Sequence, residues 1–324
     1  MADLLDLMIC RLPGLKAKER IKLEEQFDRE EDFSLLSMKD FESLLGRPMN
    51  AMPWKMSELR SKAEKDAEKA QKLGMNLVSW REKNYPPLLR EIYDPPALLF
   101  YRGQLPDPQK ALTAVVGTRK PSSQAAMKAF DLGRELGEAG ISVVSGLALG
   151  IDSMAHRGNI EGKAHTVAVL GTSLEMVYPP SNRFLARRIL ETGGLILSEY
   201  PPGTGPRKWN FPERNRIISG LARGLVIVEA PEKSGALITA HFALEQNRDL
   251  WVHSVGLSSK WGKGTLRLKE DGAAVISSAA GILIDWKMNG ASDGRPNVER
   301  QNDTAIEEAK NLTSSMAEYL DIKL

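Results

Sequence analysis

The chain has 324 residues, of which 42% are apolar and 27% are charged, a composition typical of a globular protein with about two domains. Its 44 basic residues nearly balance its 42 acidic residues, which excludes a global positive field, so a nucleic-acid site would have to be a local cluster of cations. The single cysteine, Cys10, excludes an internal disulfide framework, and with only four histidines beside it no metal site or other cofactor is predicted.

Residues 1–75 are predicted to form a small domain made only of helices. Apolar residues recur there at helical spacing, and residues 57–73 are a charged run of strong helix formers that ends at Gly74. The LPGL segment at 12–15 is faintly similar to a helix-hairpin-helix turn, which binds phosphate. An ordinary pair of packing helices is the favoured interpretation of that segment.

No targeting or membrane segment is predicted. The first residues, MADLLDL, carry acidic side chains where a signal peptide carries basic ones. No apolar run approaches the ~18 residues that a membrane-spanning helix needs. The sequence therefore predicts a cytoplasmic protein that does not associate with a membrane.

Residues 76–288 are predicted to form one α/β domain. A proline-rich connector surrounds short strands such as 98–101. Apolar, β-branched runs then alternate with amphipathic helices, and these runs lie at 111–117, 141–146, 165–171, 194–200, 224–230 and 250–256. Strands of this kind are buried on both faces, which predicts an extended Rossmann-like fold with a mostly parallel sheet. Residues 289–324 are predicted to be a linker and a C-terminal tail.

The loops that follow these strands should hold the functional site, because ligands bind at the carboxyl ends of parallel strands. The loop that begins at Gly117 is not a dinucleotide fingerprint, but its serines precede a helix and Arg119 suits a phosphate. The next loop begins with Ser145 and Gly146, where a backbone can approach a ligand closely. For Asp152, in that loop, a structural role is favoured.

A basic and aromatic stretch lies at 201–223. It contains one acidic residue, two aromatic residues and five basic residues, namely Glu213, Trp209, Phe211, Arg207, Lys208, Arg214, Arg216 and Arg223. Single-strand binders combine cations that follow the phosphates with rings on which bases stack. A structural alternative stays open, in which Phe211 fills the core and the arginines form salt bridges.

Two further loops carry weaker signals. Ser234 and Gly235 precede an apolar helix and are a plausible phosphate cradle. Trp261, between Lys260 and Lys263, could stack on a base or belong to a mobile surface loop.

Little in the sequence predicts catalysis. Ser145 has no histidine and aspartate at a recognisable spacing, and no pair of carboxylates stands out. The four histidines are more simply interpreted as packing residues. The chain is therefore predicted not to be an enzyme.

These segments together resemble the DprA/Smf family of DNA-processing proteins over about two-thirds of the chain. The resemblance rests on YPPLL (85–89), PPALL (95–99), VGTR (116–119), SGLALGIDSMAHRG (145–158), AVLGTSLEMVYPPSNR (168–183), ILSEYPPGTGPRKWNFPERNRIISGLA (196–222) and VEAPEKSGALITAHFALEQNRDLW (228–251). Motifs of this length in this order are hard to obtain by chance.

The resemblance implies a Rossmann-like homodimer that binds single-stranded DNA and protects it during natural transformation or homologous recombination. It also implies that the protein loads RecA recombinase over single-strand-binding protein. The implied DNA-binding residues are Arg119, Ser145, Gly146, Lys208, Phe211, Arg214, Asn215, Arg216, Ser234 and Gly235. Additional contacts are expected from Gly117, Arg207, Trp209, Lys260, Trp261 and Lys263.

Some segments depart from the family pattern. His253-Ser254-Val255-Gly256 stands where relatives often have Val-Pro-Gly, and Gly264-Thr265-Leu266 where they often have Gly-Thr-Asn. The residues after 288 are too few for the winged-helix domain that many relatives carry. Residues 1–75 resemble the sterile-alpha-motif-like domain of some members only weakly.

Two other functions remain open. The sheet architecture also resembles the lysine-decarboxylase-like phosphoribohydrolases, which are nucleotide-binding enzymes with a Pro-Gly-Gly-x-Gly-Thr loop. The corresponding segment here, 233–239, lacks the double glycine, which disfavours catalysis. A scaffold that docks a recombinase without binding DNA is the third interpretation.

Overall fold

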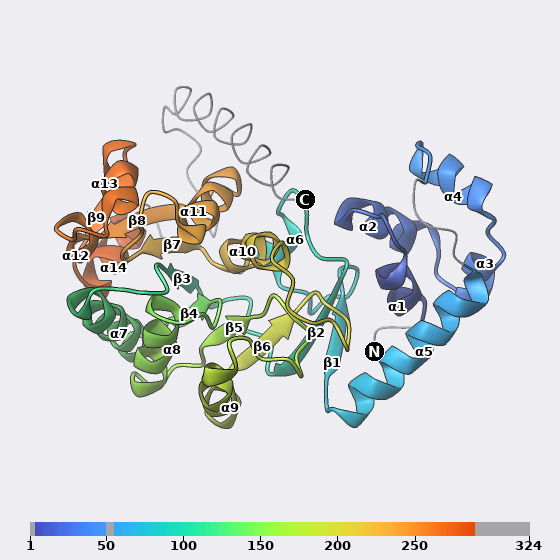
Figure 1. Ribbon diagram of the computed structural model, residues 1–324, viewed down its shortest axis with the longest axis horizontal. Coiled ribbons are helices and arrows are strands. Elements are labelled where there is room, and N and C mark those ends of the chain that lie inside the picture. Colours follow the sequence, from blue (N-terminus) through green and yellow to red (C-terminus); the bar gives the residue numbers. More distant parts are fainter. Residues whose placement is uncertain (1–3, 50–54, 289–324) are drawn as a thin grey trace.

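A computed structural model describes residues 4–49 and 55–288 of the protein (Figure 1). The segment 289–324, predicted to be a linker and tail, lies outside the described residues. No helix within the described part is both long and apolar enough to cross a bilayer.

Five helices form the described N-terminal part, residues 4–49 and 55–75, as the helical spacing of its apolar residues predicts. Ser37 and Asp40 form a capping box at the start of one of them, and Gly46 ends it at φ +69°. Phe27, Phe33 and Phe41 meet edge to face between the helices, with centroid distances of 5.6 and 5.4 Å. The helices are α1 (Leu4–Arg11), α2 (Ala17–Gln26), α3 (Glu30–Ser34), α4 (Met38–Leu45) and α5 (Met56–Lys72).

The rest of the described chain is built on a nine-stranded sheet with the order β1-β2-β6-β5-β4-β3-β7-β8-β9. Only β1 and β2 run antiparallel to their neighbours, so the predicted mostly parallel sheet is confirmed. The strands are β1 (Asn76–Ser79), β2 (Leu98–Gly103), β3 (Leu112–Val116), β4 (Ser142–Ser145), β5 (Val167–Val169), β6 (Leu195–Ser198), β7 (Gly224–Ile227), β8 (Asp249–His253) and β9 (Ala274–Ile276).

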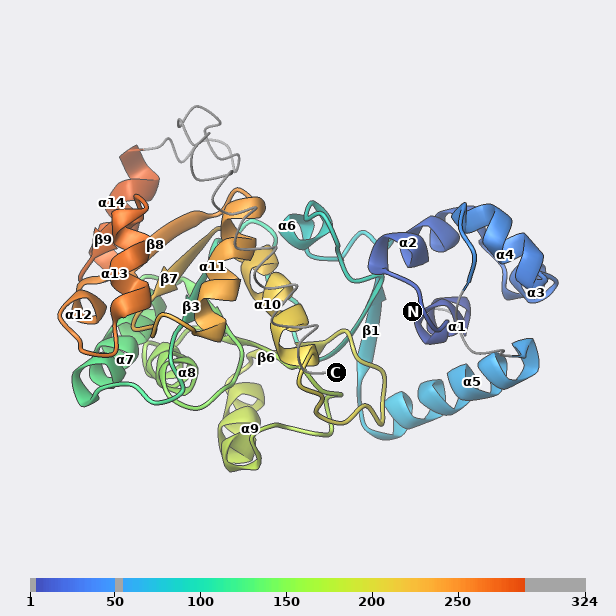
Figure 2. The same ribbon diagram turned by 45° about the horizontal axis from the view of Figure 1, so that its top comes forward.

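Helices cover both faces of this sheet (Figures 1 and 2). Successive residues of β3 show the arrangement, because Ala114 packs with α10 and α11 whereas Val115 packs with α7, α8 and α14. The helices after β1 are α6 (Pro87–Arg90), α7 (Ser123–Glu138), α8 (Ile151–Glu161), the 3-10 helix η1 (Pro180–Asn182), α9 (Arg183–Glu191), α10 (Asn210–Leu221), α11 (Gly235–Glu245), α12 (Ser254–Leu257), α13 (Lys263–Glu270) and α14 (Ala279–Met288).

The N-terminal helices share an apolar core with the sheet. Leu5 and Phe41 belong to the same buried cluster as Phe100 of β2 and Ile189 of α9. Polar contacts cross the same boundary, because Arg81, just after β1, donates to Asp6 of α1 at 3.0 Å and to two carbonyl oxygens at the end of α2. These contacts hold the helices against one end of the sheet.

The buried carboxyl group of Glu24 on α2 is expected to make the protein less stable as the pH rises. Glu24 is 1% exposed, and neither carboxyl oxygen has a hydrogen-bond partner among the described residues. Burial, and then the negative charge of Asp6, raise its pKa from 4.5 to about 9. Because the unfolded state ionises first, the stability present below pH 4.5 is lost progressively up to pH 9, with a loss of about 3 kcal/mol at pH 7.

Denaturant unfolding at several pH values between 4.5 and 9 tests this expectation. Glu24→Gln should remove most of the fall in stability over that range, since an amide does not ionise. Glu25→Gln, at the exposed neighbouring position on α2, should leave the pH dependence unchanged. Equal pH profiles for the wild type and Glu24→Gln would contradict a protonated Glu24.

Candidate nucleic-acid interface

The strand order reverses between β3 and β7. From β3 the chain builds outward through β4, β5 and β6, and it then returns to place β7 on the other side of β3. The segments that leave the carboxyl ends of β3 and β7 therefore diverge, as they do at the ligand site of open α/β sheets. The loops after β3, β4, β5, β6 and β7, here called the strand-end loops, meet at this edge.

The buried side chain of Arg214 forms hydrogen bonds to the ends of two of these strands, β4 and β5. It lies on α10 and is only 4% exposed. One guanidinium nitrogen, Nη1, donates to the carbonyl oxygen of Gly146 at 2.9 Å and to that of Val169. The carboxylate of Asp152 accepts from the backbone N–H of Gly146 at 3.1 Å. Gly146, in the loop after β4, is therefore hydrogen-bonded both to this carboxylate and to the guanidinium of Arg214.

Burial lowers the pKa of Arg214 to about 10, and Asp152 opposes this effect. Arg214 therefore keeps its charge at neutral pH. Gly146 is the residue type that this packing requires, because a Cβ there would lie 2.5 Å from Nη2 of Arg214. The structural role favoured for Asp152 from the sequence agrees with this geometry.

A basic and aromatic group lies at the same edge, and we call Arg119, Tyr178 and Phe211 the aromatic cluster. Arg119 and Tyr178 are exposed, and Phe211 is partly exposed. The guanidinium carbon of Arg119 lies 5.8 Å from the ring centroid of Phe211. The rings of Phe211 and Tyr178 are 5.4 Å apart and inclined at 44°. Three separate segments thus converge here, namely the loop after β3, the loop after β5 and the start of α10.

Phe211 is held by its surroundings rather than standing free. Its ring lies against Gly171, where a Cβ would be 2.9 Å from Cδ1 of the ring. The neighbouring side chain of Asn210 is buried and donates to the carbonyl oxygen of Gly171 at 3.0 Å. The first turn of α10 therefore carries Phe211 to the carboxyl end of β5, beside Tyr178, which is 43% exposed.

The residues just before α10 are exposed, as expected for a binding loop. Arg207 and Lys208 are exposed, and Trp209 is 48% exposed. The guanidinium of Arg207 lies 5.5 Å from the ring centroid of Trp209. These three side chains precede the helix N-terminus, whose backbone dipole also favours anions.

Arg216 is not part of this exposed surface, contrary to the expectation of a groove lined by both α10 arginines. It is 8% exposed and forms two hydrogen bonds to the carboxylate of Glu199, at 2.8 and 2.7 Å, and one to Asp94 at 3.2 Å. Burial by itself would lower the pKa of Arg216, but the two carboxylates outweigh it and raise the pKa above its usual value. The alternative of an arginine held in internal salt bridges applies to this residue.

Ser145 also faces inward. Its hydroxyl is buried at the end of β4 and donates to the carbonyl oxygen of Val115 at 2.7 Å. Gly146, beside it, is buried over Arg214. Both residues therefore shape the strand end, and the exposed cations and rings lie above them.

Ser234, Gly235 and Asn215 lie together at the start of α11. Ser234 caps the helix by accepting from the backbone N–H of Ala236 at 3.3 Å. The side chain of Asn215 donates to the carbonyl oxygen of Gly235 at 3.2 Å and accepts from Nε of Arg214 at 3.3 Å. Asn215 thus connects the buried arginine with the loop after β7.

The start of α7 already holds an internal anion. The carboxylate of Glu229, fully buried after β7, accepts from the backbone N–H of Ser122 at 2.8 Å and from its hydroxyl at 2.9 Å. Gly117 lies close to the same residue, since a Cβ there would be 2.9 Å from the carbonyl oxygen of Glu229. A phosphate at this helix end would compete with Glu229, so the contribution of the loop is the exposed Arg119.

The loop with Lys260, Trp261 and Lys263 lies beside the loop after β7. The backbone N–H of Gly264 donates to the carbonyl oxygen of Ala230 at 2.9 Å, and the hydroxyl of Thr265 accepts from the N–H of Ala230 at 2.8 Å. Trp261 is 52% exposed, and the ammonium of Lys260 lies 5.4 Å from its ring centroid. This second basic and aromatic pair therefore belongs to the same edge of the sheet.

Sequence reasoning missed several residues that build the site. Tyr178 and Asn210 lie within segments that resemble the DprA/Smf family, but the sequence indicated no role for either residue. Glu229 had a recognisable signal, because an acid directly after a strand buried on both faces must find an internal partner. The sequence around Tyr178 contained no such signal, because only the fold brings its ring to that of Phe211.

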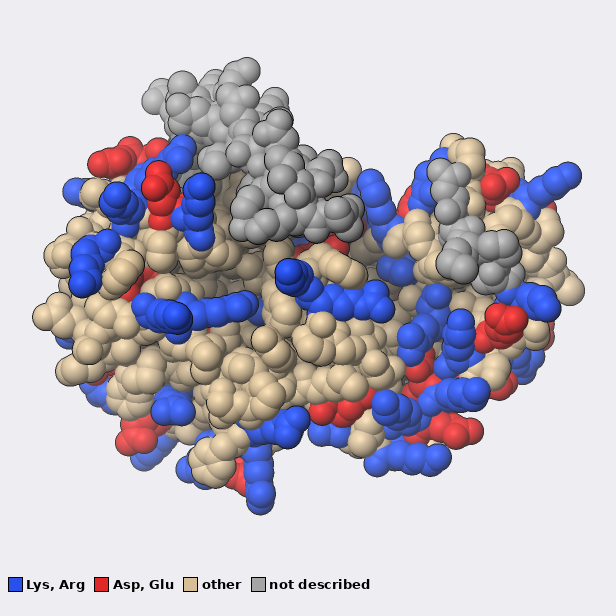
Figure 3. Space-filling model, viewed as in Figure 1, with Lys and Arg blue, Asp and Glu red and all other residues tan. Residues whose placement is uncertain are grey.

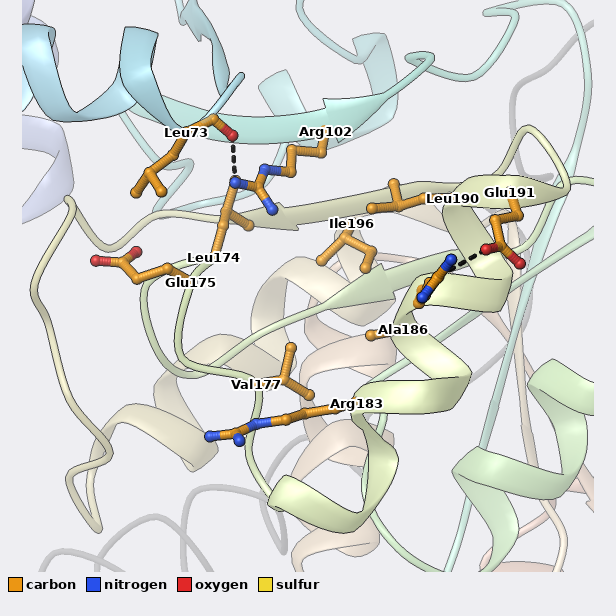
Figure 4. A pocket seen from close by; sticks show the side chains of 11 residues that line it. Leu73, Arg102, Leu174, Glu175, Val177, Arg183, Ala186, Leu190, Glu191 and Ile196 are labelled. Atoms are coloured by element: carbon orange, nitrogen blue, oxygen red, sulfur yellow. Dashed lines mark hydrogen bonds and ion pairs between the residues drawn. The ribbon is translucent and has the colours of Figure 1, made fainter.

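A cavity of about 450 Å³ lies elsewhere, between β2, β6 and α9 (Figure 4). Apolar side chains such as Leu174, Val177 and Ile196 line it, together with Arg102 and Arg183. Arg102 donates to the carbonyl oxygen of Leu73 at the end of α5. One side of α9 closes the cavity, with both apolar and charged side chains, namely Ala186, Leu190, Arg183, Arg187 and Glu191.

No catalytic group is evident among the described residues at the strand-end loops. His156 is fully buried with its Nδ1 2.7 Å from the hydroxyl oxygen of Thr166. Burial, and then the positive charge of Arg214, lower its pKa to about 3, so it is neutral at physiological pH. Across residues 4–49 and 55–288, no three His, Cys, Asp or Glu side chains are grouped to hold a metal ion.

Comparison with known proteins identifies similar chains. The family model described as DNA recombination-mediator protein A matches residues 76–287. The DNA processing protein DprA of Bacillus subtilis is 41% identical over 211 residues, which are 65% of this chain and 71% of that protein. Protein Smf of Synechocystis sp. is 39% identical over 249 residues, which cover 76% of this chain but only 60% of that protein.

Two solved structures are also similar. The crystal structure of DprA from Streptococcus pneumoniae matches with a TM-score of 0.72 and 32% identity, over 88% of this chain and 98% of that one. DprA from Helicobacter pylori, described in terms of its single-stranded DNA binding mode, matches with a TM-score of 0.58 and 28% identity. That match covers 66% of this chain and 96% of the other.

Proposed function

The chain belongs to the DNA recombination-mediator protein A family, and from this membership we propose that its aromatic cluster binds single-stranded DNA during DNA processing in natural transformation. The observation that carries the proposal is the convergence of Arg119, Tyr178 and Phe211 at the point where the strand order reverses. The similar protein from Helicobacter pylori is described as binding single-stranded DNA, which supports the same ligand here.

The chemistry of the cluster suits a single strand better than a duplex. Arg119 of the cluster, and Lys208 just before α10, are exposed cations that can hold phosphates. The exposed ring of Tyr178 and the partly exposed ring of Phe211 can contact unpaired bases. A base that is paired within a duplex does not present a free face to such rings. Contacts to phosphates and ring faces carry little sequence information, so we expect weak sequence preference.

Arg214 acts in this scheme as a positioning residue. Its guanidinium is buried and hydrogen-bonded to carbonyl oxygens, so it does not offer a free fork to phosphate. It fixes the loop after β4 and the start of α10, and thereby the position of Phe211. Its charge, close beneath the surface, adds to the positive potential that a strand meets.

The partners proposed for the chain are those of a recombination mediator. We propose that a homodimer presents two such sites, so that a long strand is held with avidity. The bound strand would be protected and passed to RecA recombinase, over single-strand-binding protein. The proposed role is a binding function without catalysis, because the hydroxyl of Ser145 is turned into the sheet and His156 is neutral and buried.

Removing a cation from the site is expected to weaken single-strand binding and to flatten its salt dependence. Lys208→Ala and Arg119→Ala should each reduce the slope of log K against log salt by about 0.7, the value for one phosphate contact on a single strand. Fluorescence anisotropy of labelled oligo-dT across a salt series measures both quantities. A duplex of the same length should bind more weakly throughout.

Lys110→Ala is the matched control for these variants. Lys110 is exposed and precedes β3, so it lies at the amino ends of the strands, at the opposite edge of the sheet. Its replacement should leave affinity and slope unchanged. If Lys208→Ala and Arg119→Ala both behave like Lys110→Ala, the assignment of the site is wrong.

A further inference from the structure

The outer face of α9, like the aromatic cluster, combines cations with an aromatic ring, here three arginines with one phenylalanine. Arg183, Phe184, Arg187 and Arg188 occupy positions i, i+1, i+4 and i+5, which share one side of a helix. The opposite side packs into the core through Leu185, Ala186 and Ile189. Phe184 is 79% exposed, and the three arginines on the same side of the helix are exposed as well. Figure 3 shows basic side chains gathered at the lower edge of the molecule, where α9 lies in Figure 1.

The first turn of α9 lies at the same edge of the sheet as the strand-end loops. Asn182, directly before the helix, is buried and donates to the carbonyl oxygen of Leu147 at 2.8 Å and to the hydroxyl of Ser153 at 3.0 Å. Leu147 belongs to the loop after β4, which Arg214 and Asp152 hold in place. The helix therefore starts beside the proposed site.

One short segment joins the aromatic cluster to this face. The ring of Tyr178 contacts that of Phe211, and the chain passes through η1 before it reaches Arg183. Val177, next to Tyr178, lines the cavity under α9 together with Arg183, and Figure 4 shows the two side chains near each other. A strand that leaves Tyr178 along this segment would meet Arg183 first.

The acidic residue within this face is held only by weak pairs. Glu191 contacts Arg187 at 2.7 Å and Arg188 at 3.9 Å. The side chains of Arg187 and Glu191 are 79% and 44% exposed, and exposed pairs of this kind contribute little stability. A phosphate can therefore replace Glu191 as the partner of Arg187 at small cost.

We propose that the outer face of α9 is a second subsite for the same single strand, which continues to it from the aromatic cluster. The inference rests on the function proposed above and extends its site. Arg183, Arg187 and Arg188 hold phosphates, and Phe184 stacks on an unpaired base. The occupant is a single-stranded nucleic acid rather than an acidic protein, because the exposed rings of Tyr178 and Phe184 and the cations between and beside them lie along one continuous segment.

Strands of two lengths test the proposal with the full chain. An oligo-dT of about 6 nucleotides fills only the aromatic cluster, whereas one of about 20 nucleotides also reaches α9. Phe184→Leu, which keeps an apolar side chain but removes the ring, should weaken binding of the long strand about five-fold or more and leave the short strand unaffected. Phe184→Tyr should bind both strands as the wild type does.

The cations are tested by the same pair of strands. Arg183→Ala combined with Arg187→Ala should weaken the long strand and reduce its salt slope by about 1.4, two phosphate contacts, without changing the slope of the short strand. Arg134→Ala is the control, since Arg134 forms an equivalent pair with Glu138 on α7 at 2.7 Å. It should change neither strand.

Each other outcome overturns the proposal in a recognisable way. Equal affinities of wild type and variants for the long strand would show that α9 does not bind nucleic acid, and would leave an acidic protein as the partner of this face. Equal losses for both strands would show that α9 is not a separate subsite. No binding of either strand by the wild type would instead overturn the proposed function itself.

Discussion

Replacing Arg216 by methionine is expected to lower the free energy of unfolding by about 3–5 kcal/mol, the usual cost of breaking a buried ion pair from one side. The guanidinium is 8% exposed and forms two hydrogen bonds to Glu199 and one to Asp94. Methionine fills a similar volume but leaves the carboxylate of Glu199, whose side chain is 17% exposed, without its counter-ion. The loss reflects this uncompensated charge more than any missing apolar contact.

Urea denaturation of the purified protein measures the effect. Arg267→Met is a suitable control, because Arg267 on α13 is about half exposed and lies 3.8 Å from Asp271, a geometry worth well under about 1 kcal/mol. The expected pattern is a large loss for Arg216→Met and almost none for Arg267→Met. If Arg216→Met is as stable as the wild type but binds DNA more weakly, Arg216 contacts DNA and its structural role is wrong.

Replacing Arg214 by methionine is expected to have an effect of similar size, about 3–5 kcal/mol, for a related reason. The substitution leaves the carbonyl oxygens of Gly146 and Val169 without their donor and Asp152 without a neighbouring positive charge. Burial already raises the pKa of Asp152 above 3.8, and Arg214 opposes this effect. Without Arg214 the pKa of Asp152 should rise further.

The pH dependence distinguishes this explanation from a simple loss of packing. A carboxyl group with a raised folded-state pKa stabilises the protein below its unfolded pKa, and that stability is lost as the pH rises. Arg214→Met should therefore lose stability more steeply than the wild type as the pH increases above 3.8. Adding Asp152→Asn should recover part of the loss, in a double-mutant cycle with Asp152→Asn alone. A pH-independent loss that Asp152→Asn does not relieve would contradict the coupling.

Much of the fold was predictable because buried strands require apolar residues, which can be recognised in the sequence. Six apolar runs between 111 and 256 correspond to β3 to β8, since strands covered by helices on both faces contain almost no polar residues. The strands β1 and β9, at the two edges of the sheet, were missed. They have four and three residues, and both are partly exposed. Asn76 and Ser79 leave only two apolar residues in β1, and the apolar run of β9 is too short to indicate a strand.

The stretch at 201–223 shows the limit of such predictions. Interpreted as one loop, its cations appear equivalent. In the structure, α10 begins at Asn210, so Arg214 and Arg216 lie on a helix that packs against the sheet and α11. Arg207 and Lys208 precede the helix and stay exposed. Pro212 did not indicate a helix, although proline is tolerated in a first turn.

The sequence by itself determined the class of fold, the inner strands of the sheet and the segment in which cations and aromatic rings accumulate. These properties follow from the local period of apolar residues and from composition, both of which can be determined from short segments of the sequence. Only the tertiary structure decided which cations face solvent, which carboxylates neutralise the others, and that Tyr178 meets Phe211. Such pairings join residues far apart in the chain, and their energies depend on burial and distance, which no local pattern specifies.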